Sequence, residues 1–174
     1  SIENFDLHGA LAQHAHFFER FGGHAMAAGL TLHSARFESF RETMMAFATE
    51  HLAEEDLVPR LHLDAEVQLT TMNLATRAAL QAMAPFGRMN EEPRFLLRKV
   101  ILKGSPRVIK ERHLSFVVRQ NGTEARCVAW NKADAWAHLP DGTVLDLACT
   151  LDESHFQGQK STQLTVLDLR LSIP

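Results

Sequence analysis

A nine-residue segment at positions 21–29, Phe-Gly-Gly-His-Ala-Met-Ala-Ala-Gly, gathers residues without bulk around one polar side chain. Two adjacent glycines let the backbone approach a ligand and adopt φ values forbidden to other residues. A histidine in such surroundings can donate one or two hydrogen bonds to a phosphate oxygen. The alternative is a helix C-cap followed by a tightly packed strand, with the histidine solvated. The functional interpretation predicts a phosphate contact made by Gly22, Gly23, His24, Ala28 and Gly29.

The stretch 94–112 is strongly basic, with seven Lys or Arg residues against Glu111 alone. A positively charged groove lined with aromatic side chains is how proteins hold single-stranded nucleic acids. The alternative is that this stretch is the solvated end of a hairpin. The residues expected to contact nucleic acid are Arg94, Arg98, Lys99, Lys103, Arg107, Lys110 and Arg112.

Four aromatic residues are candidates for stacking on bases: Phe86, Phe116, Trp130 and Trp136. Phe116, like Phe95, lies within an apolar run, which favours a place in the core. Trp136 stands in the polar segment 131–138, and it is the aromatic residue that we expect to contact nucleic acid.

The ten histidines raise the question of a metal site. His14 and His16 are two residues apart, so on a helix they face directions about 200° apart. No cysteine or carboxylate stands beside them at ligand spacing. We also find no paired-carboxylate motif, nucleophile elbow or phosphate loop. The sequence therefore predicts no metal site within these residues.

The composition is that of an ordinary soluble globular protein, with 174 residues, 45% hydrophobic, and a net charge of −3. This average hides an asymmetry, because residues 1–57 carry −6 and the remainder +3. No apolar run approaches the roughly 18–20 residues of a membrane span, and no signal peptide is recognised. Cys127 and Cys149 lie in apolar runs typical of buried, reduced thiols, so we expect a cytoplasmic protein without membrane partners. Because the chain begins at Ser1, we expect a piece of a longer protein.

The first third of the chain has helical periodicity. Apolar residues spaced three and four apart predict a helix over 7–21, which the glycine pair ends. A strand is expected over 27–32, and then a long helix over 34–54 with Ser34 as its N-cap. An acidic run and Pro59 mark the first domain boundary.

Beyond Pro59 the pattern is mainly that of strands. We expect a strand over 61–69, a helix over 74–83, and a hairpin closed by Asn121-Gly122, a typical type I′ turn. The polar stretch 152–162 is expected to connect the last two strands. The strands after the helix are predicted at 95–102, 113–119, 123–130, 144–151 and 163–171. The fold class is α+β: a helix-and-strand remnant followed by a five-stranded OB-fold β-barrel with one helix.

The segment Gly22-Gly23-His24-x-x-Ala27-Ala28-Gly29 resembles the signature of the DHH-associated domain of DHH-family phosphoesterases. The preceding Phe18-Glu19-Arg20-Phe21 is similar to the approach to that signature in the RecJ family of single-stranded-DNA exonucleases. A second passage, from Leu80 through Pro85-Phe86-Gly87 and Asn90 to Phe95, resembles the opening of the RecJ OB domain. Met89 and Glu92 depart from it, standing where the family pattern has glycine and proline.

The resemblance implies that 1–57 is the end of a phosphate-gripping DHH-associated domain and 58–174 is an OB-fold nucleic-acid-binding domain. The parent would be a metal-dependent exonuclease that degrades single-stranded DNA from the 5′ end, with Mn²⁺ or Mg²⁺ held by an N-terminal DHH domain. No Asp-His-His occurs here, so we expect this chain alone not to cleave DNA. His24 would support catalysis only by contacting a phosphate. The implied partners are single-stranded DNA, the missing DHH domain and a single-stranded-DNA-binding protein.

The sequence is also compatible with two other functions. The same glycine-histidine signature occurs in DHH-family oligoribonucleases and nucleotide phosphatases, but those end near the motif, whereas about 110 residues follow it here. An OB-fold is also a protein-interaction module, because a fold does not determine a function.

Overall fold

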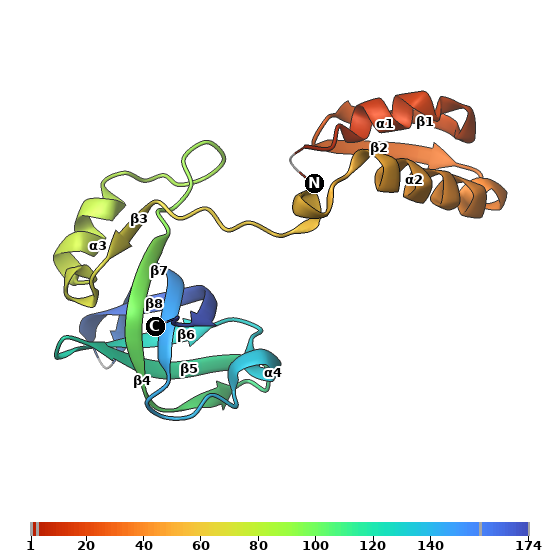
Figure 1. The fold of residues 1–174 in the computed structure, drawn as a ribbon. Helices are drawn as coiled ribbons and strands as arrows, with labels where there is room; N and C mark the ends of the chain where they lie inside the picture. Colours follow the sequence, from red (N-terminus) through yellow and green to blue (C-terminus); the bar gives the residue numbers. More distant parts are fainter. Residues whose placement is uncertain (1, 3, 157, 174) are drawn as a thin grey trace. The chain divides into compact units, whose positions relative to one another are not determined.

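The computed structural model describes residue 2 and residues 4–156 and 158–173, with Phe156 described only in its backbone. The chain divides into two compact units, Ser1–Leu61 and His62–Pro174. Figure 1 shows the elements of each unit along the chain.

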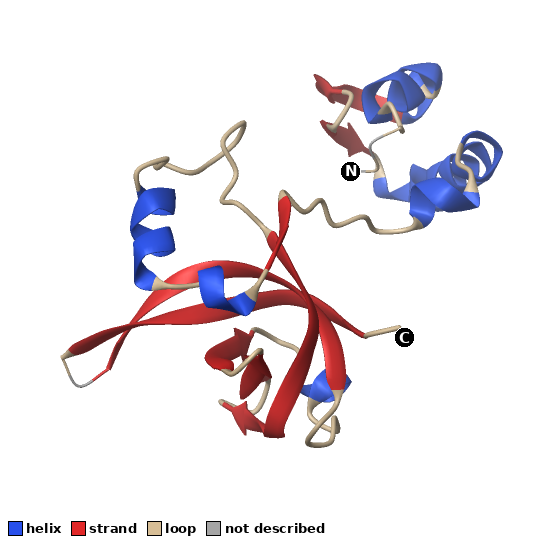
Figure 2. Ribbon diagram, turned by 60° about the vertical axis from the view of Figure 1, so that its left-hand side comes forward, coloured by secondary structure: helices blue, strands red, loops and turns tan. Residues whose placement is uncertain are grey.

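The first unit is a two-stranded antiparallel hairpin with helices packed against one of its faces. Strands β1 (Phe18–His24) and β2 (Ala27–Leu32) form the hairpin, so the predicted strand over 27–32 is confirmed. Helices α1 (Leu7–Gln13) and α2 (Phe37–His51) lie on the same side of it, as Figure 2 shows. Among the described residues of this unit, only Ala10 and Leu11 are buried apolar residues.

The predicted helix over 7–21 is wrong beyond Gln13, where α1 ends. A single turn at Ala15–Phe17 leads directly into β1. Phe18 and Phe21 face the helices from this strand, with ring centroids 5.1 Å from Phe40 and 5.7 Å from His8. Aromatic residues three apart suit a helix, but pairing with β2 gives these rings the same burial from a strand.

The observed helix α2 is shorter at both ends than the helix predicted over 34–54. Ser34 belongs to a 3-10 turn, and α2 begins at Phe37 with Arg36 in the N-cap position. The acidic run forms a separate turn, Glu54–Leu57. There Asp56 accepts hydrogen bonds from the Asn4 side chain (2.8 Å) and the Ala53 N–H (3.0 Å), which lower the pKa of its carboxyl group.

The second unit contains a closed five-stranded barrel, as predicted. Its strands are β4 (Phe95–Ile109), β5 (His113–Gln120), β6 (Thr123–Ala129), β8 (Gln159–Leu171) and β7 (Val144–Phe156), in that order around the barrel. β7 pairs back with β4 and closes it. This order is that of an OB-fold, in which the second and third barrel strands carry the ligand face.

Three shorter elements accompany the barrel. Strand β3 (Ala65–Val67) pairs in parallel with the start of β4, so only the centre of the predicted strand over 61–69 is a strand. Helix α3 (Leu74–Gln81) confirms the predicted helix over 74–83. A further short helix, α4 (Ala133–Trp136), lies between β6 and β7 and was not predicted.

The hairpin closed by Asn121-Gly122 is confirmed, with φ values of 49° and 80° at its two turn residues. The prediction that the polar stretch 152–162 is a connection is wrong. β7 and β8 continue to pair along it as far as Phe156 and Gln159. Most side chains along it are exposed or half-buried, so it lacks the apolar alternation by which a strand is recognised.

Alternate residues of the barrel strands point inward and form one continuous core. Cys127 and Cys149 are buried there as free thiols, as predicted, and burial raises the pKa of Cys149 to about 12. Phe95 and Phe116 are also core residues. The fully buried apolar side chains include Leu97, Val100, Leu102, Leu114, Val118, Leu145, Leu147, Leu151 and Leu164.

Candidate nucleic-acid interface

The glycine-histidine segment forms the end of the β1–β2 hairpin. Gly22 pairs with Gly29, Gly23 with Ala28, and His24 with Ala27. Because side chains alternate along a strand, the face turned away from the helices, here called the glycine face, consists of Arg20, Gly22, His24, Ala27, Gly29 and Thr31. All six are exposed, and no atom lies within 4 Å of where a Cβ on Gly22 or Gly29 would stand.

At Gly23 there is no space for a side chain, in contrast to Gly22 and Gly29. Its φ is 143°, and a Cβ added there would stand 2.5 Å from the Ala28 Cα and even closer to the Ala27 carbonyl oxygen. The two strands therefore approach each other more closely than a side chain allows. Ala28 pairs with Gly23 on the helix side of the hairpin. Its methyl group therefore points away from the glycine face, although Ala28 was among the predicted phosphate contacts.

The predicted basic residues divide into those paired with carboxylates and those that are not. Arg94 bonds to Glu91 at 2.6 Å, Lys103 to Glu124 at 2.6 Å, and Arg98 to Glu66 at 2.8 Å. Arg107, Lys110 and Arg112 make no ion pair within the described part of the chain, and all three are exposed.

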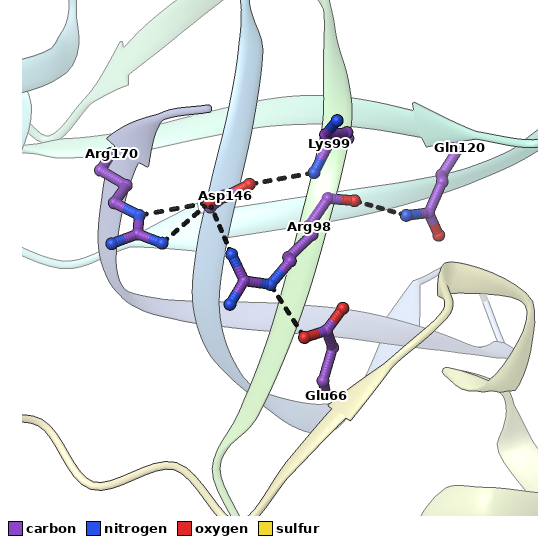
Figure 3. Close-up of polar contacts among 6 residues, drawn as sticks. All are labelled: Glu66, Arg98, Lys99, Gln120, Asp146 and Arg170. Carbon is purple, nitrogen blue, oxygen red and sulfur yellow. Dashed lines mark hydrogen bonds and ion pairs between the residues drawn. The ribbon is translucent and has the colours of Figure 1, made fainter. Parts of the chain in front are cut away.

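Arg98 and Lys99 belong to a polar network around the buried carboxylate of Asp146, shown in Figure 3. Asp146 accepts hydrogen bonds from the Lys99 backbone N–H (3.1 Å) and from Arg170 Nε (3.2 Å), and Arg98 Nη1 lies 3.7 Å away. Burial alone would raise the pKa of Asp146, but the Lys99 N–H, Ser172 and Arg170 together lower it.

Gln120 fixes the same part of β4, since its Nε2 donates to the Arg98 carbonyl oxygen (2.6 Å) and its Oε1 accepts from the Leu69 N–H (2.7 Å). Lys99 lies at an irregularity between β4 and β7 and has a φ of 52°. The Lys99 backbone and the Arg98 guanidinium therefore serve the barrel itself, since Asp146 satisfies the N–H that this irregularity leaves unpaired in the sheet.

The unpaired cations lie on or beside the outer surface of β5 and β6. Arg107 pairs in register with Ser115, and Ser115 with Val128; Val117 pairs with Arg126. These five residues, here called the barrel face, alternate along their strands with inward-pointing residues such as Phe116 and Cys127. Arg126 is exposed and makes no ion pair with any described residue, so the face carries two free guanidinium groups.

The β4–β5 turn and the β7–β8 hairpin are the two loops that flank this face in an OB-fold. Lys110 and Arg112 lie at the first of them, together with Glu111. On the second, Glu153 accepts hydrogen bonds from Lys160 (3.1 Å) and His155 (2.5 Å), which lower the pKa of its carboxyl group.

The two tryptophans differ in exposure. Trp136, the predicted stacking residue, is half-buried against the core on α4, with Lys132 Nζ 4.8 Å from its ring centroid. Trp130 follows β6 on the outward side, is 51% exposed, and packs edge-on against His113 with ring centroids 4.8 Å apart. Trp130 is one of the four aromatic candidates named from the sequence, whereas Arg126, two strand positions after Glu124 on the same side of β6, was not among the predicted contacts.

His113 supports Trp130 from a buried position. Its Nδ1 accepts a hydrogen bond from the Asn131 N–H at 3.0 Å, which requires the unprotonated nitrogen. Burial, with Arg112 and Lys110 nearby, lowers the pKa of His113. The ring against which Trp130 packs is therefore neutral at neutral pH.

The loop before β4 contains the two departures from the family pattern. Met89 has a φ of 68° and is 95% exposed, so it occupies a backbone conformation that favours glycine. Asn90 braces the loop by donating to the carbonyl oxygens of Met83 (3.0 Å) and Pro85 (2.9 Å). Glu92 lies 3.5 Å from Arg77, so its charge is offset locally.

No group of three or more His, Cys, Asp or Glu side chains among the described residues could hold a metal ion. These residues therefore do not fit the Mn²⁺ or Mg²⁺ that the family resemblance implies for a longer protein. No helix in the described ranges is long and apolar enough to cross a membrane.

Comparison with known proteins gives the same relatives by sequence and by structure. Residues 63–168 match the RecJ OB domain family. The chain is 33% identical over 175 residues to the single-stranded-DNA-specific exonuclease RecJ of Dickeya dadantii, and 25% identical over 173 residues to that of Bacillus subtilis. These alignments cover 95% and 99% of this chain, but only 30% and 22% of the relatives.

A crystal structure of RecJ from Thermus thermophilus in complex with Mn²⁺ superimposes on the whole chain with a TM-score of 0.78 at 27% identity, using 25% of that protein. The chain therefore spans less than a third of the length of the relatives it matches. The family match, which covers more than half of the chain, shows that this protein belongs to the RecJ family and that its barrel is a RecJ OB domain.

Proposed function

We propose that this chain binds and guides single-stranded DNA as the C-terminal part of a RecJ-like 5′-to-3′ exonuclease of DNA repair and recombination. The observation that carries the proposal is the barrel face, where Arg107 and Arg126 are exposed and free of carboxylates on the ligand-binding side of an OB-fold. Trp130, exposed at the end of β6, offers an aromatic surface on which a base can stack.

The first unit contributes a second contact. Gly22 and Gly29 leave bare backbone open to solvent, and His24 is exposed beside them. We assign residues 1–57 to the end of the DHH-associated domain and His24 to a phosphate contact. This histidine supports catalysis by holding DNA and performs no bond-breaking step.

Cleavage itself is assigned to an N-terminal DHH domain, which supplies the ligands for Mn²⁺ or Mg²⁺ in the full protein. The chain alone is accordingly proposed not to cleave DNA. The length of the RecJ relatives supports this assignment, since their sequences extend well beyond the part that aligns here. A cytoplasmic location and a single-stranded-DNA-binding protein as a further partner belong to the same proposal.

The test is a salt titration of binding to a fluorescent oligo-dT. For single strands, the logarithm of the binding constant falls by roughly 0.7 per phosphate contact for each decade of salt. The double variant Arg107→Gln/Arg126→Gln should therefore lower this slope by about 1.4 if each guanidinium makes one contact. The matched control Arg41→Gln/Arg94→Gln also removes two arginine charges, but both are already paired with glutamates and neither residue lies on the barrel face.

We expect the control to lower the slope less than the test variant does. An equal loss in both variants would show that net charge, rather than the barrel face, attracts DNA. A wild-type chain that does not bind at low salt would overturn the proposal and favour the protein-interaction function. Digestion of single-stranded DNA by the purified chain with Mn²⁺ would overturn the separation of binding from cleavage.

A further inference from the structure

The glycine face carries a second polar residue besides His24. Arg20, Gly22 and His24 alternate along β1, so their side chains lie on one side of the hairpin. Arg20 pairs in register with Thr31, so a hydroxyl-bearing residue lies directly across from it on β2 and on the same side of the hairpin. The two glycines lie between this polar pair and His24.

A one-residue irregularity in β1 keeps this face free of aromatic rings. Phe18 pairs with Leu32 and Arg20 with Thr31, so β1 advances by two residues where β2 advances by one. Leu32 and Thr31 are neighbours and point to opposite sides, which places Phe18 and Arg20 on opposite sides as well. In a regular strand, Phe18 would share the side of Arg20 and His24.

The extra residue therefore places the aromatic side chain of Phe18 on the helix side of the hairpin and the polar side chains of Arg20 and His24 on the opposite side. Phe18 lies against Phe40 on the helix side, with ring centroids 5.1 Å apart. The opposite side has no side chain bulkier than threonine between Arg20 and His24. Bulges occur preferentially beside functional sites, where they redirect a side chain.

The charge of Arg20 is not used within the fold. It is exposed and makes no ion pair or hydrogen bond through its side chain within the described residues. Two of the other three arginines of this unit are engaged, since Arg41 bonds to Glu38 at 2.9 Å and Arg36 donates to the His16 carbonyl oxygen at 3.1 Å. In a unit with a net charge of −5, a free guanidinium beside bare backbone is the local feature that attracts an anion.

We propose that Arg20 is a second phosphate-binding residue, which acts with His24 at opposite ends of the glycine face. The inference rests on the proposed function, because it takes the ligand to be single-stranded DNA. Four residues of extended strand separate their Cα atoms by about 13 Å. The two side chains thus contact different phosphates of one strand, while the glycine backbone between them leaves room for the sugars.

The experiment is an NMR titration of the full 174-residue chain with a 5′-phosphorylated oligo-dT tetranucleotide. The amide signals of Gly22 and Gly29 report binding at the glycine face, and those of Val117 and Arg126 report binding at the barrel face. In Arg20→Gln, the Kd from the glycine signals should rise roughly tenfold, as expected when a hydrogen bond from a charged donor is lost. The Kd from the barrel signals should stay unchanged.

The matched control is Arg41→Gln, which removes the same charge from the same unit but from an arginine already paired with glutamate. It should leave both Kd values unchanged. A glycine-face Kd that is equal in Arg20→Gln and wild type, or raised equally by Arg41→Gln, overturns the inference. If neither set of amides shifts in the wild type, the proposed function itself fails, so the two failures are distinguishable.

Discussion

The two units differ in how much apolar core supports the surface that is proposed to bind DNA. The barrel buries a continuous apolar core, and its outward residues are free to carry charge. In the first unit, α2 has no buried residue among its fifteen, and Phe37 is 51% exposed. The contrast teaches that the barrel's ligand face rests on its own packing, whereas the glycine face is supported by a thin layer of aromatic contacts.

The largest effect on stability is expected when a side chain in the barrel core is shortened. Leu147 is fully buried, so Leu147→Ala should lower the free energy of unfolding by about 2–5 kcal/mol. Both tryptophans lie in the second unit, so tryptophan fluorescence during urea unfolding measures the barrel alone. Phe37→Ala is the control and should shift this transition by less than about 0.5 kcal/mol. A larger effect from Phe37 would mean that the barrel depends on the first unit.

A second, smaller effect is expected from the carboxylate that holds the irregular part of β4. Asp146→Asn removes the charge that faces Arg98 and Arg170 and should cost the barrel about 2 kcal/mol. Because the pKa of Asp146 is lowered on folding, its contribution is present above its unfolded pKa of about 3.9 and is lost as the pH falls below it.

The control for this prediction is Glu66→Gln, which changes the exposed partner of Arg98. Exposed ion pairs contribute little, so urea unfolding should show a loss of less than about 1 kcal/mol. If both variants lowered the free energy of unfolding equally, the burial of Asp146 would not explain its contribution to the stability of the barrel.

A pH-dependent effect is expected at the support of Trp130. The lowered pKa of His113 means that folding favours its neutral form. The resulting stability is complete above the unfolded pKa of about 6.5 and is lost as the pH falls through that range. Urea unfolding of the wild type should therefore show stability that falls as the pH drops below about 6.5, a fall that His113→Gln lacks. His138→Gln, at an exposed position, should retain the drop.

The smallest effect concerns the loop that precedes the barrel. Met89→Gly relieves a left-handed backbone conformation but adds freedom to the unfolded chain, so a net gain of about 0.5–1 kcal/mol is expected. Met89→Ala keeps the Cβ and should give no gain. Equal urea midpoints for the two variants would show that this loop unfolds independently of the barrel.

The barrel could be predicted from the sequence because its residues alternate between core and solvent, and because Asn121-Gly122 encodes its own turn. The β7–β8 extension could not, since its polar residues pair through the backbone without covering a core. In the first unit, the spacing of Phe18 and Phe21 fits a helix as well as a bulged strand, and only the pairing with β2 decides between them.

The candidate site was predictable to a similar degree. The glycine-histidine segment is compact in sequence, so its residues were identifiable before the fold was known. The basic stretch was misleading in part, because ion pairing depends on distant residues: Glu66 lies 32 positions before Arg98, and Glu124 lies 21 after Lys103. Arg126 lies outside the basic stretch and stands between two neutral neighbours, so the charge pattern of the sequence does not single it out.

The extra residue in β1 makes this hairpin sensitive to chain length in a way that substitutions do not reveal. Glu19 has no register partner in β2, so its deletion would give regular pairing and leave Phe18 opposite Leu32, still facing the helices. One residue inserted between Thr31 and Leu32 would instead supply that partner and turn Phe18 to the side of Arg20 and His24. Sequence relatives should therefore tolerate an alignment gap at Glu19 but no insertion between Thr31 and Leu32.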